Sequence, residues 1–466
     1  MTRPASLGEL RSSGWVSRPV KEELRANVVR ALSEGRPLVP GVVGYEGTVV
    51  PQLANALLAG HDVIFLGERG QAKTRIIRSM TNLLDEWLPV VAGSEINDDP
   101  YHPVSKHARH LVAERGEETP IEWVPRERRF GEKLATPDTS IADLIGEVDP
   151  IKVAEGRYLS DELTIHYGLL PRTNRGVFSI NELPDLAERI QVGLLNVLEE
   201  RDVQIRGYKI QLPLDVVLFA SANPEDYTNR GRIITPLKDR FGAQIRTHYP
   251  LDVEHELAIV EQEARPLVAE GLAVKVPDFM SEIVAEISQL ARRSPHVNQR
   301  SGVSARMSIA NYETLVANAM RRALTCAERE VVPRVSDLDA IAASTSGKIE
   351  IETVEDGREG QVLDRIVKTA VVEVFRARVS PERLGEIVRS FEEGLVIDAG
   401  EDVPAARYTE VLAAVPALAP VLAELEVGES PAGIASGIEL VLEGLHLTKR
   451  LNKDALGARA SYRSRG

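Results

Sequence analysis

The first 250 residues contain three short runs of apolar side chains, each followed directly by small or polar residues. The runs are residues 63–66, 176–180 and 216–222. Apolar runs of this length are typical of strands that are buried on both faces, as in a parallel sheet, and segments with helical spacing lie between them. We therefore predict an α/β domain over residues 1–250, with helices on both faces of a parallel sheet. The carboxyl ends of its strands should share one crevice.

From residue 251 onward the apolar residues follow the spacing of amphipathic helices instead. This pattern predicts a separate helical domain over residues 251–347 and a Glu- and Gly-rich linker over 348–361. A further helical region should occupy residues 362–448. The basic residues 449–466 are expected to form a solvated, frayed tail, with a basic partner-binding tail as the alternative.

Two segments interrupt the predicted α/β domain. Residues 93–175 are polar and weakly periodic, which indicates either an insertion with a working role or a flexible excursion. Alternating apolar positions around Gly207 predict a β-hairpin over residues 203–212.

Composition narrows the classes of function. The chain has 466 residues, 43% hydrophobic and 27% charged, and a formal net charge of −14. This acidity disfavours contact with nucleic acid or an anionic membrane. Cys326 is the only cysteine, so an internal disulfide is excluded, and this suits a reducing cytosol. Residues 1–10 lack the apolar core of a signal peptide and no stretch predicts a membrane helix, so we expect a cytoplasmic protein.

The segment after the first predicted strand carries the first candidate chemistry. A glycine loop between a strand and a helix binds phosphate through backbone N–H groups, Lys73 would reach the β and γ phosphates, and the Thr74 hydroxyl would hold Mg²⁺. The pattern normally has glycine before the lysine, where this chain has Ala72. We expect Ala72 to adopt a right-handed helical conformation, so this departure should weaken the motif only slightly. The predicted phosphate-binding residues are Gly67, Glu68, Arg69, Gly70, Gln71, Ala72, Lys73 and Thr74.

The order of these motifs resembles an AAA+ ATPase, and more narrowly the ATPase subunit of magnesium chelatase and its MoxR-type relatives. The resemblance covers about residues 40–345. It rests on the phosphate loop, Gly-Val-Phe-Ser-Ile-Asn-Glu-Leu at 176–183, Ala-Ser-Ala-Asn-Pro-Glu at 220–225, Leu-Lys-Asp-Arg-Phe-Gly at 237–242, and the insertion around residues 143–150 and 168–170.

This resemblance implies a P-loop NTPase of the AAA+ class, with ATP and Mg²⁺ as cofactors and residues 251–347 as an α-helical lid. It also implies a homo-oligomeric, six-membered ring and a separate partner chain that carries a von Willebrand factor A domain.

The resemblance further assigns roles to four residues. Glu182 would polarise the attacking water, and Asn223 would be the polar sensor that orients this water. Arg240 resembles an arginine finger that is offered to the γ-phosphate of the adjoining subunit. Arg306 occupies the place of a second sensor arginine on the lid.

One position departs from the family pattern. Asn181 stands where the family has aspartate before the glutamate. An amide retains hydrogen bonds to metal-bound water but lacks the negative charge that helps hold Mg²⁺, so metal binding or turnover should be weaker. Asp185 lies one turn further along the chain, and its carboxylate is a candidate to compensate for the missing negative charge at position 181.

Three functions remain open from the sequence. The first is a motor that remodels a partner protein, either for metal insertion into a porphyrin or in a MoxR-like chaperone role. The second is a nucleotide-binding scaffold whose hydrolysis Asn181 has silenced. The third is a transcription activator of the bacterial enhancer-binding kind, which the net acidity and the lack of a Gly-Ala-Phe-Thr-Gly-Ala loop both disfavour.

Overall fold

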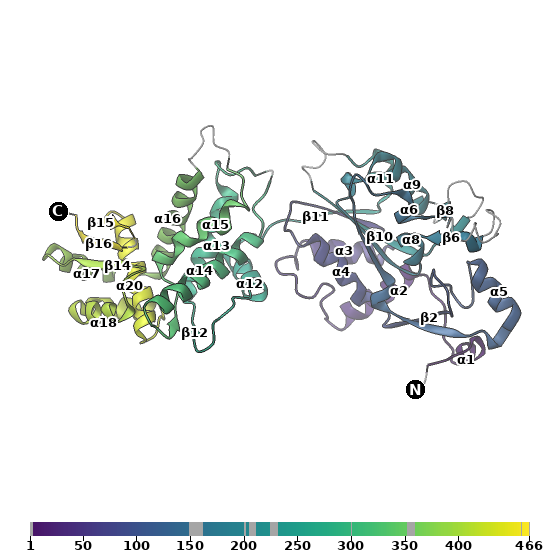
Figure 1. Ribbon diagram of the computed structural model, residues 1–466, viewed down its shortest axis with the longest axis horizontal. Coiled ribbons are helices and arrows are strands. Elements are labelled where there is room, and N and C mark those ends of the chain that lie inside the picture. Colours follow the sequence, from purple (N-terminus) through teal and green to yellow (C-terminus); the bar gives the residue numbers. More distant parts are fainter. Residues whose placement is uncertain are drawn as a thin grey trace. The chain divides into compact units, whose positions relative to one another are not determined.

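The chain forms two compact units, Met1–His248 and Tyr249–Gly466, in a computed structural model (Figure 1). The structure describes residues 3–148, 162–199, 202–204, 211–223, 232–299, 301–351, 359–457 and 459–465.

A five-stranded sheet lies at the centre of the first unit (Figure 1). All neighbouring strands in it are parallel. The strand order is β11 (Ala243–Arg246), β1 (Val63–Leu66), β10 (Val216–Ala222), β7 (Gly176–Asn181) and β4 (Phe130–Leu134). The predicted fold class, a parallel sheet flanked by helices, is therefore confirmed.

Alternate side chains of each strand enter two different hydrophobic cores, because successive residues of a strand point to opposite faces. Val63 and Phe65 pack with helices α2 (Val20–Ser33), α3 (Val49–Leu58) and α4 (Lys73–Ser79) on one face. Ile64 packs on the other face, where the helices are α8 (Leu169–Arg172), α9 (Glu188–Glu199) and α11 (Thr235–Arg240).

For the polar segment 93–175 we left open an insertion or a flexible excursion, and its described part is built into the unit. It contains α5 (Lys106–Arg115), β3 (Ile121–Pro125), which pairs with β2 (Trp87–Val91), and the edge strand β4 of the central sheet. Strands β4 and β11 carry polar residues because they lie at the two sheet edges, where a solvent-facing side chain costs little. This is why apolar runs did not predict them.

The structure describes the paired strands of the predicted hairpin over residues 203–212 but not its turn. Strands β8 (Asp202–Gln204) and β9 (Gln211–Pro213) pair in the antiparallel direction. Its turn, residues 205–210, lies outside the described residues, as do residues 149–150 and 224–225 of the motifs quoted above.

The main hydrophobic core of the second unit takes side chains from both the predicted lid and the predicted C-terminal region. The core takes side chains from α13 (Asp278–Arg293), α14 (Arg306–Thr325), α16 (Glu359–Arg378), α18 (Ala405–Ala414) and α20 (Pro431–Leu447). Helices α16 and α20 approach so closely that a Cβ on Gly444 would lie 2.3 Å from Cγ of Phe375. The two predicted regions thus share this core.

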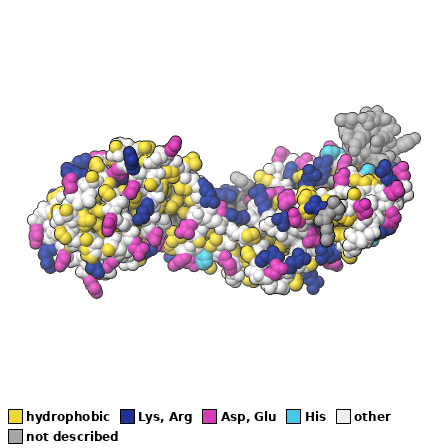
Figure 2. Space-filling model, turned by 90° about the horizontal axis from the view of Figure 1, so that it is seen from below, with side chains coloured by type: hydrophobic (Ala, Val, Ile, Leu, Met, Phe, Trp, Pro, Cys, Tyr) yellow, Lys and Arg dark blue, Asp and Glu magenta, His cyan; other side chains and the backbone are white. Residues whose placement is uncertain are grey.

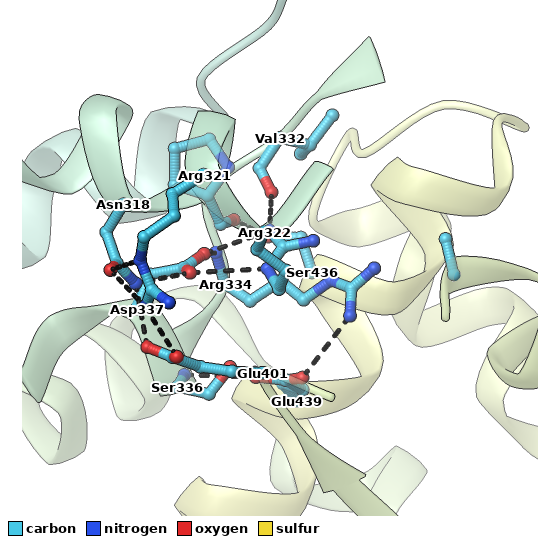
Figure 3. Close-up of polar contacts among 12 residues, drawn as sticks. Asn318, Arg321, Arg322, Val332, Arg334, Ser336, Asp337, Glu401, Ser436 and Glu439 are labelled. Atoms are coloured by element: carbon cyan, nitrogen blue, oxygen red, sulfur yellow. Dashed lines mark hydrogen bonds and ion pairs between the residues drawn. The ribbon is translucent and has the colours of Figure 1, made fainter. Parts of the chain in front are cut away.

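A buried polar network joins the same segments (Figure 3). Arg322 of α14 donates two hydrogen bonds to the Asp337 carboxylate, at 3.2 and 3.0 Å. Arg334 donates to the Val403 carbonyl, and the Ser336 amide donates to Glu439 of α20. Breaking one partner of a fully buried ion pair leaves an uncompensated charge, which typically costs about 3–5 kcal/mol. This network therefore ties residues 318–337 firmly to residues 401–439.

The prediction that the C-terminal residues form a frayed tail is wrong. Strands β15 (Leu451–Leu456) and β16 (Arg459–Ser464) form a hairpin that adds to β14 (Ile397–Gly400). The Tyr462 side chain is buried and its hydroxyl donates to the Glu443 carboxylate, while Lys453 lies 2.8 Å from that same carboxylate. Three basic residues of this segment, Lys453, Arg459 and Arg463, thus form ion pairs with carboxylates.

The surface carries charges of both signs. Acidic and basic side chains are interspersed over the described surface of each unit in the view of Figure 2. Within the described residues no single helix has the length and apolar composition of a membrane span, and one pair bent by 106°, Ala405–Ala414 with Pro416–Glu424, meets that test together.

Candidate nucleotide site

The loop between β1 and α4 closes against the end of the sheet. The Gly67 amide donates to the Ala222 carbonyl at 3.1 Å, and the Gln71 side chain accepts a hydrogen bond from the Thr247 hydroxyl at 2.7 Å. A Cβ on Gly67 would lie 2.0 Å from the Thr247 hydroxyl oxygen. A side chain at position 67 would therefore have to displace the side chains of Thr247 and Gln71.

Ala72 corrects one sequence expectation. Its backbone lies in the left-handed region, with φ 56° and ψ 12°, rather than in a right-handed helical conformation. The loop must turn at this residue to start α4, and an L-residue in that region costs about 1–2 kcal/mol relative to a right-handed conformation. The alanine thus stores strain at the position where the motif normally has glycine.

Lys73 lies at the centre of the site and is only 7% exposed. Its ammonium donates to the carbonyls of Gly67 and Glu68 and, at 2.7 Å, to the side-chain oxygen of Asn223. These three acceptors match in number the three N–H donors of an ammonium group. We therefore expect a phosphate oxygen that binds Lys73 to replace at least one of them.

Asn223 connects this lysine to Glu182. Its side-chain N–H donates to the Glu182 carboxylate at 2.7 Å, while its oxygen accepts from Lys73. The three residues follow or lie at the ends of β1, β7 and β10, so the parallel sheet brings them together. Glu182 also has a positive φ of 56°, a conformation in which strained functional residues are often found.

Asn181 contacts a carboxylate that the sequence did not predict. Its side-chain amide donates to Glu132 on the neighbouring strand β4, and its oxygen accepts from the Ser221 hydroxyl at 3.3 Å. Asp185, the residue expected to compensate for Asn181, lies in η5 (Leu183–Asp185) and donates its backbone N–H to the Glu182 carbonyl. Glu132 is thus the carboxylate that Asn181 contacts.

Tyr45 is a second contributor that the sequence did not reveal. Its hydroxyl oxygen lies 2.9 Å from the Gln71 carbonyl of the phosphate loop and 2.6 Å from the His248 carbonyl. Burial raises the pKa of the Tyr45 hydroxyl to about 12. A neutral tyrosine therefore fastens the loop to the segment that follows β11.

The two arginines lie outside this cluster of contacts. Arg240 is the last residue of α11 and donates to the Pro236 carbonyl of its own helix at 2.9 Å. Arg306 is exposed at the first residue of α14, in the second unit. Their roles toward a γ-phosphate stay predictions.

The oxygen donors near Asn181 fit Mg²⁺ that arrives with a nucleotide. Among the described residues no group of three or more His, Cys, Asp or Glu side chains is arranged to hold a metal ion. Mg²⁺ usually takes one or two protein oxygen ligands and completes its shell with phosphates and water, so such a group is not needed. Thr74, Asn181 and the nearby carboxylates are hard oxygen donors of the required type.

Comparisons with known proteins show which sequences this chain resembles. No protein-family model matches it. The magnesium-chelatase subunit ChlI-1 of Arabidopsis thaliana is 29% identical over 250 residues, which are 49% of this chain and 53% of that protein. The subunit ChlI of Nostoc sp. is 30% identical over 231 residues, 48% of this chain and 57% of that protein. Over about half of its length, this chain is similar to magnesium-chelatase subunits of the ChlI type.

The kinship has a limited extent. The chain spans somewhat more than half the length of these two magnesium-chelatase relatives. Solved structures that match this chain include NtrX from Brucella abortus, with a TM-score of 0.40, 16% identity, and coverage of 79% of this chain and 69% of that one. The complex of magnesium-chelatase subunits BchI and BchD matches with a TM-score of 0.36 and 22% identity, covering 68% of this chain and 96% of that one. At such TM-scores the kinship rests on the sequence matches.

Proposed function

We propose that this chain is an ATPase that binds ATP and Mg²⁺ beside Lys73 and hydrolyses the terminal phosphate in a homo-oligomeric ring. The chain of hydrogen bonds from Lys73 through Asn223 to Glu182 carries this proposal. In this chain the Asn223 amide links the Lys73 ammonium, which can bind phosphate, to the Glu182 carboxylate, which can activate a water molecule for attack.

Different residues of this chain would have separate roles in phosphoryl transfer. The Lys73 ammonium exchanges one of its present acceptors for phosphate oxygens, which stabilises the charge of the transferred group. The Asn223 amide holds the Glu182 carboxylate in place, and Glu182 accepts a proton from the attacking water. When bound, Mg²⁺ neutralises phosphate charge, with Thr74 and Asn181 as the residues that would hold it.

The resemblance to AAA+ ATPases and the roles it assigns to the two arginines support the proposed assembly. Arg240 acts on the nucleotide of a neighbouring subunit, so the site is complete only in a ring, with six subunits by resemblance. Arg306 couples phosphate loss to motion of the helical unit as a lid. The ring remodels a separate protein with a von Willebrand factor A domain in the cytoplasm, in a chelatase-like or MoxR-like chaperone role.

Two substitutions test the proposal. Lys73→Ala should abolish ATP binding, whereas Glu182→Gln should bind ATP and lose turnover by a factor of about 10²–10⁴, the usual contribution of a general base. Matched controls are Lys368→Ala and Glu122→Gln, which remove the same groups at exposed positions outside the site. Turnover that survives Lys73→Ala or Glu182→Gln in purified oligomer contradicts the proposal.

A scaffold with slow hydrolysis is the second candidate, and Asn181 favours it. The amide at this position lacks the charge that helps hold Mg²⁺. A large gain in turnover on Asn181→Asp, from a wild-type rate near background, supports the scaffold. A wild-type rate in the range of other ATPases supports the motor.

A further inference from the structure

Glu132 lies beside the residue where the metal-binding carboxylate of this family is missing. It belongs to β4, whose Leu134 is in register with Asn181 of β7. Glu132 is two residues before Leu134, so it shares a face of the sheet with Asn181 and is its diagonal neighbour. Its carboxylate accepts the side-chain N–H of Asn181.

A second element holds the same carboxylate. Arg78 of α4 donates two hydrogen bonds to Glu132, at 2.8 and 3.2 Å, and this contact raises the pKa of the Arg78 guanidinium. Arg78 is four residues after Thr74, so the two side chains lie on the same face of α4. The Glu132 carboxylate therefore sits between the end of β7 and the helix that carries the predicted magnesium residue Thr74.

The chemistry of the pair is complementary. An asparagine amide donates to a carboxylate, whereas an aspartate at position 181 would meet Glu132 as a second negative charge. The chain thus combines an uncharged residue at the usual acidic position with an acid on the adjacent strand. The negative charge is kept at this end of the sheet and is displaced by one strand.

We propose that Glu132 supplies the carboxylate through which this site favours Mg²⁺–nucleotide, with Asn181 and Arg78 as the residues that position it. This inference rests on the proposed function, because it assigns the magnesium dependence of that same site. The exposed Arg78–Glu132 ion pair adds little stability by itself, since such pairs are typically worth about 0–1 kcal/mol. Loss of the carboxylate and loss of the arginine should therefore have different effects.

The test is the binding of a fluorescent ATP analogue to the full chain, titrated with free Mg²⁺ and repeated in EDTA. Glu132→Gln should raise the Mg²⁺ concentration for half-maximal binding by about tenfold, the lower end of the usual loss when a partner of a metal site is removed. Binding in EDTA should not change. Glu122→Gln, which removes an exposed carboxylate on β3, should leave both titrations as in the wild type.

Two further variants separate a metal role from a structural one. Arg78→Gln should shift the Mg²⁺ titration by less than about threefold, because it leaves the carboxylate in place. Adding Asn181→Asp to Glu132→Gln should restore most of the Mg²⁺ dependence, because this double variant returns one carboxylate to the site. Rescue of this kind also shows that Glu132→Gln had not simply unfolded the unit.

The outcomes have distinct meanings. An unshifted titration for Glu132→Gln, an equal shift for Arg78→Gln, or no rescue by Asn181→Asp overturns the inference while nucleotide binding and the proposed function stand. Absence of nucleotide binding by the wild-type chain overturns the proposed function and the inference together.

Discussion

Lys73 and Asn223 are 150 residues apart in the chain, yet the ammonium nitrogen of one lies 2.7 Å from the side-chain oxygen of the other. Asn223 in turn holds the Glu182 carboxylate at 2.7 Å. One amide thus fixes both the phosphate-binding cation and the candidate base. Its side chain is therefore a direct link between these two charged groups.

Replacement of this amide should uncouple the two charged groups. We expect Asn223→Ala to lower ATP turnover by about 10²-fold, because the base is no longer oriented toward water, while ATP affinity falls much less. Steady-state turnover and equilibrium binding measure the two effects. Asn55→Ala, on the exposed side of α3, is the control. Equal losses in affinity and turnover would point to a collapsed site instead.

The strained alanine gives a prediction about stability. Ala72→Gly should stabilise the first unit by up to about 1 kcal/mol, because relief of left-handed strain exceeds the added flexibility of the unfolded glycine. Gly70→Ala, at φ 75°, should destabilise that unit by about 1–2 kcal/mol. Trp15, Trp87 and Trp123 all lie in the first unit, so tryptophan fluorescence in a urea titration reports its unfolding. A destabilised Ala72→Gly protein would contradict the strain at this residue.

Tyr45 predicts a dependence on alkaline pH. Its folded-state pKa of about 12 exceeds the ordinary tyrosine pKa of 10.0, so the neutral hydroxyl favours the folded state. This contribution is complete below pH 10 and is lost as the pH rises toward 12. The stability difference between the wild type and Tyr45→Phe should therefore shrink by about 1–2 kcal/mol between pH 9 and pH 11.5. Urea titrations at the two pH values test this, and a constant difference would show that Tyr45 ionises as it does in the unfolded chain.

The role proposed for Arg240 predicts that two inactive variants regain ATPase activity when their subunits are mixed. Arg240→Ala should lower turnover by about 10³-fold, the lower range for an arginine finger, without preventing ATP binding. Mixing Arg240→Ala with Glu182→Gln subunits should recover part of the activity, because some interfaces then combine an intact Glu182 with an intact Arg240 from the neighbour. Arg246→Ala, at an exposed position of β11, is the control. If mixtures stay inactive, Arg240 does not act across an interface.

The sequence predicted the parts of the fold that are buried on both sides. Strands β1, β7 and β10 are continuous apolar runs because helices cover both of their faces, and their ends carry Lys73, Glu182 and Asn223. The edge strands β4 and β11 expose polar side chains, so no apolar run marked them. In the second unit, amphipathic helices have the same spacing whichever helix they pack against, and so the shared core could not be read from periodicity.

The errors at the site have related causes. The left-handed backbone of Ala72 is imposed by closure of the loop, which residue identity alone does not reveal. Glu132 was missed because its contact with Asn181 joins two strands that are far apart in sequence. Tyr45 was also missed because its contacts, with the carbonyls of Gln71 and His248, join segments that are separate in the sequence.

The most direct test of the central claim is a structure of the Glu182→Gln chain with ATP and Mg²⁺. The account predicts that the Lys73 ammonium lies within hydrogen-bonding distance of the β or γ phosphate and that at least one of its contacts with Gly67, Glu68 and Asn223 has been released. The terminal phosphate should lie against the residues at positions 182 and 223. A nucleotide bound elsewhere, or one that leaves all three contacts of Lys73 intact, would contradict it.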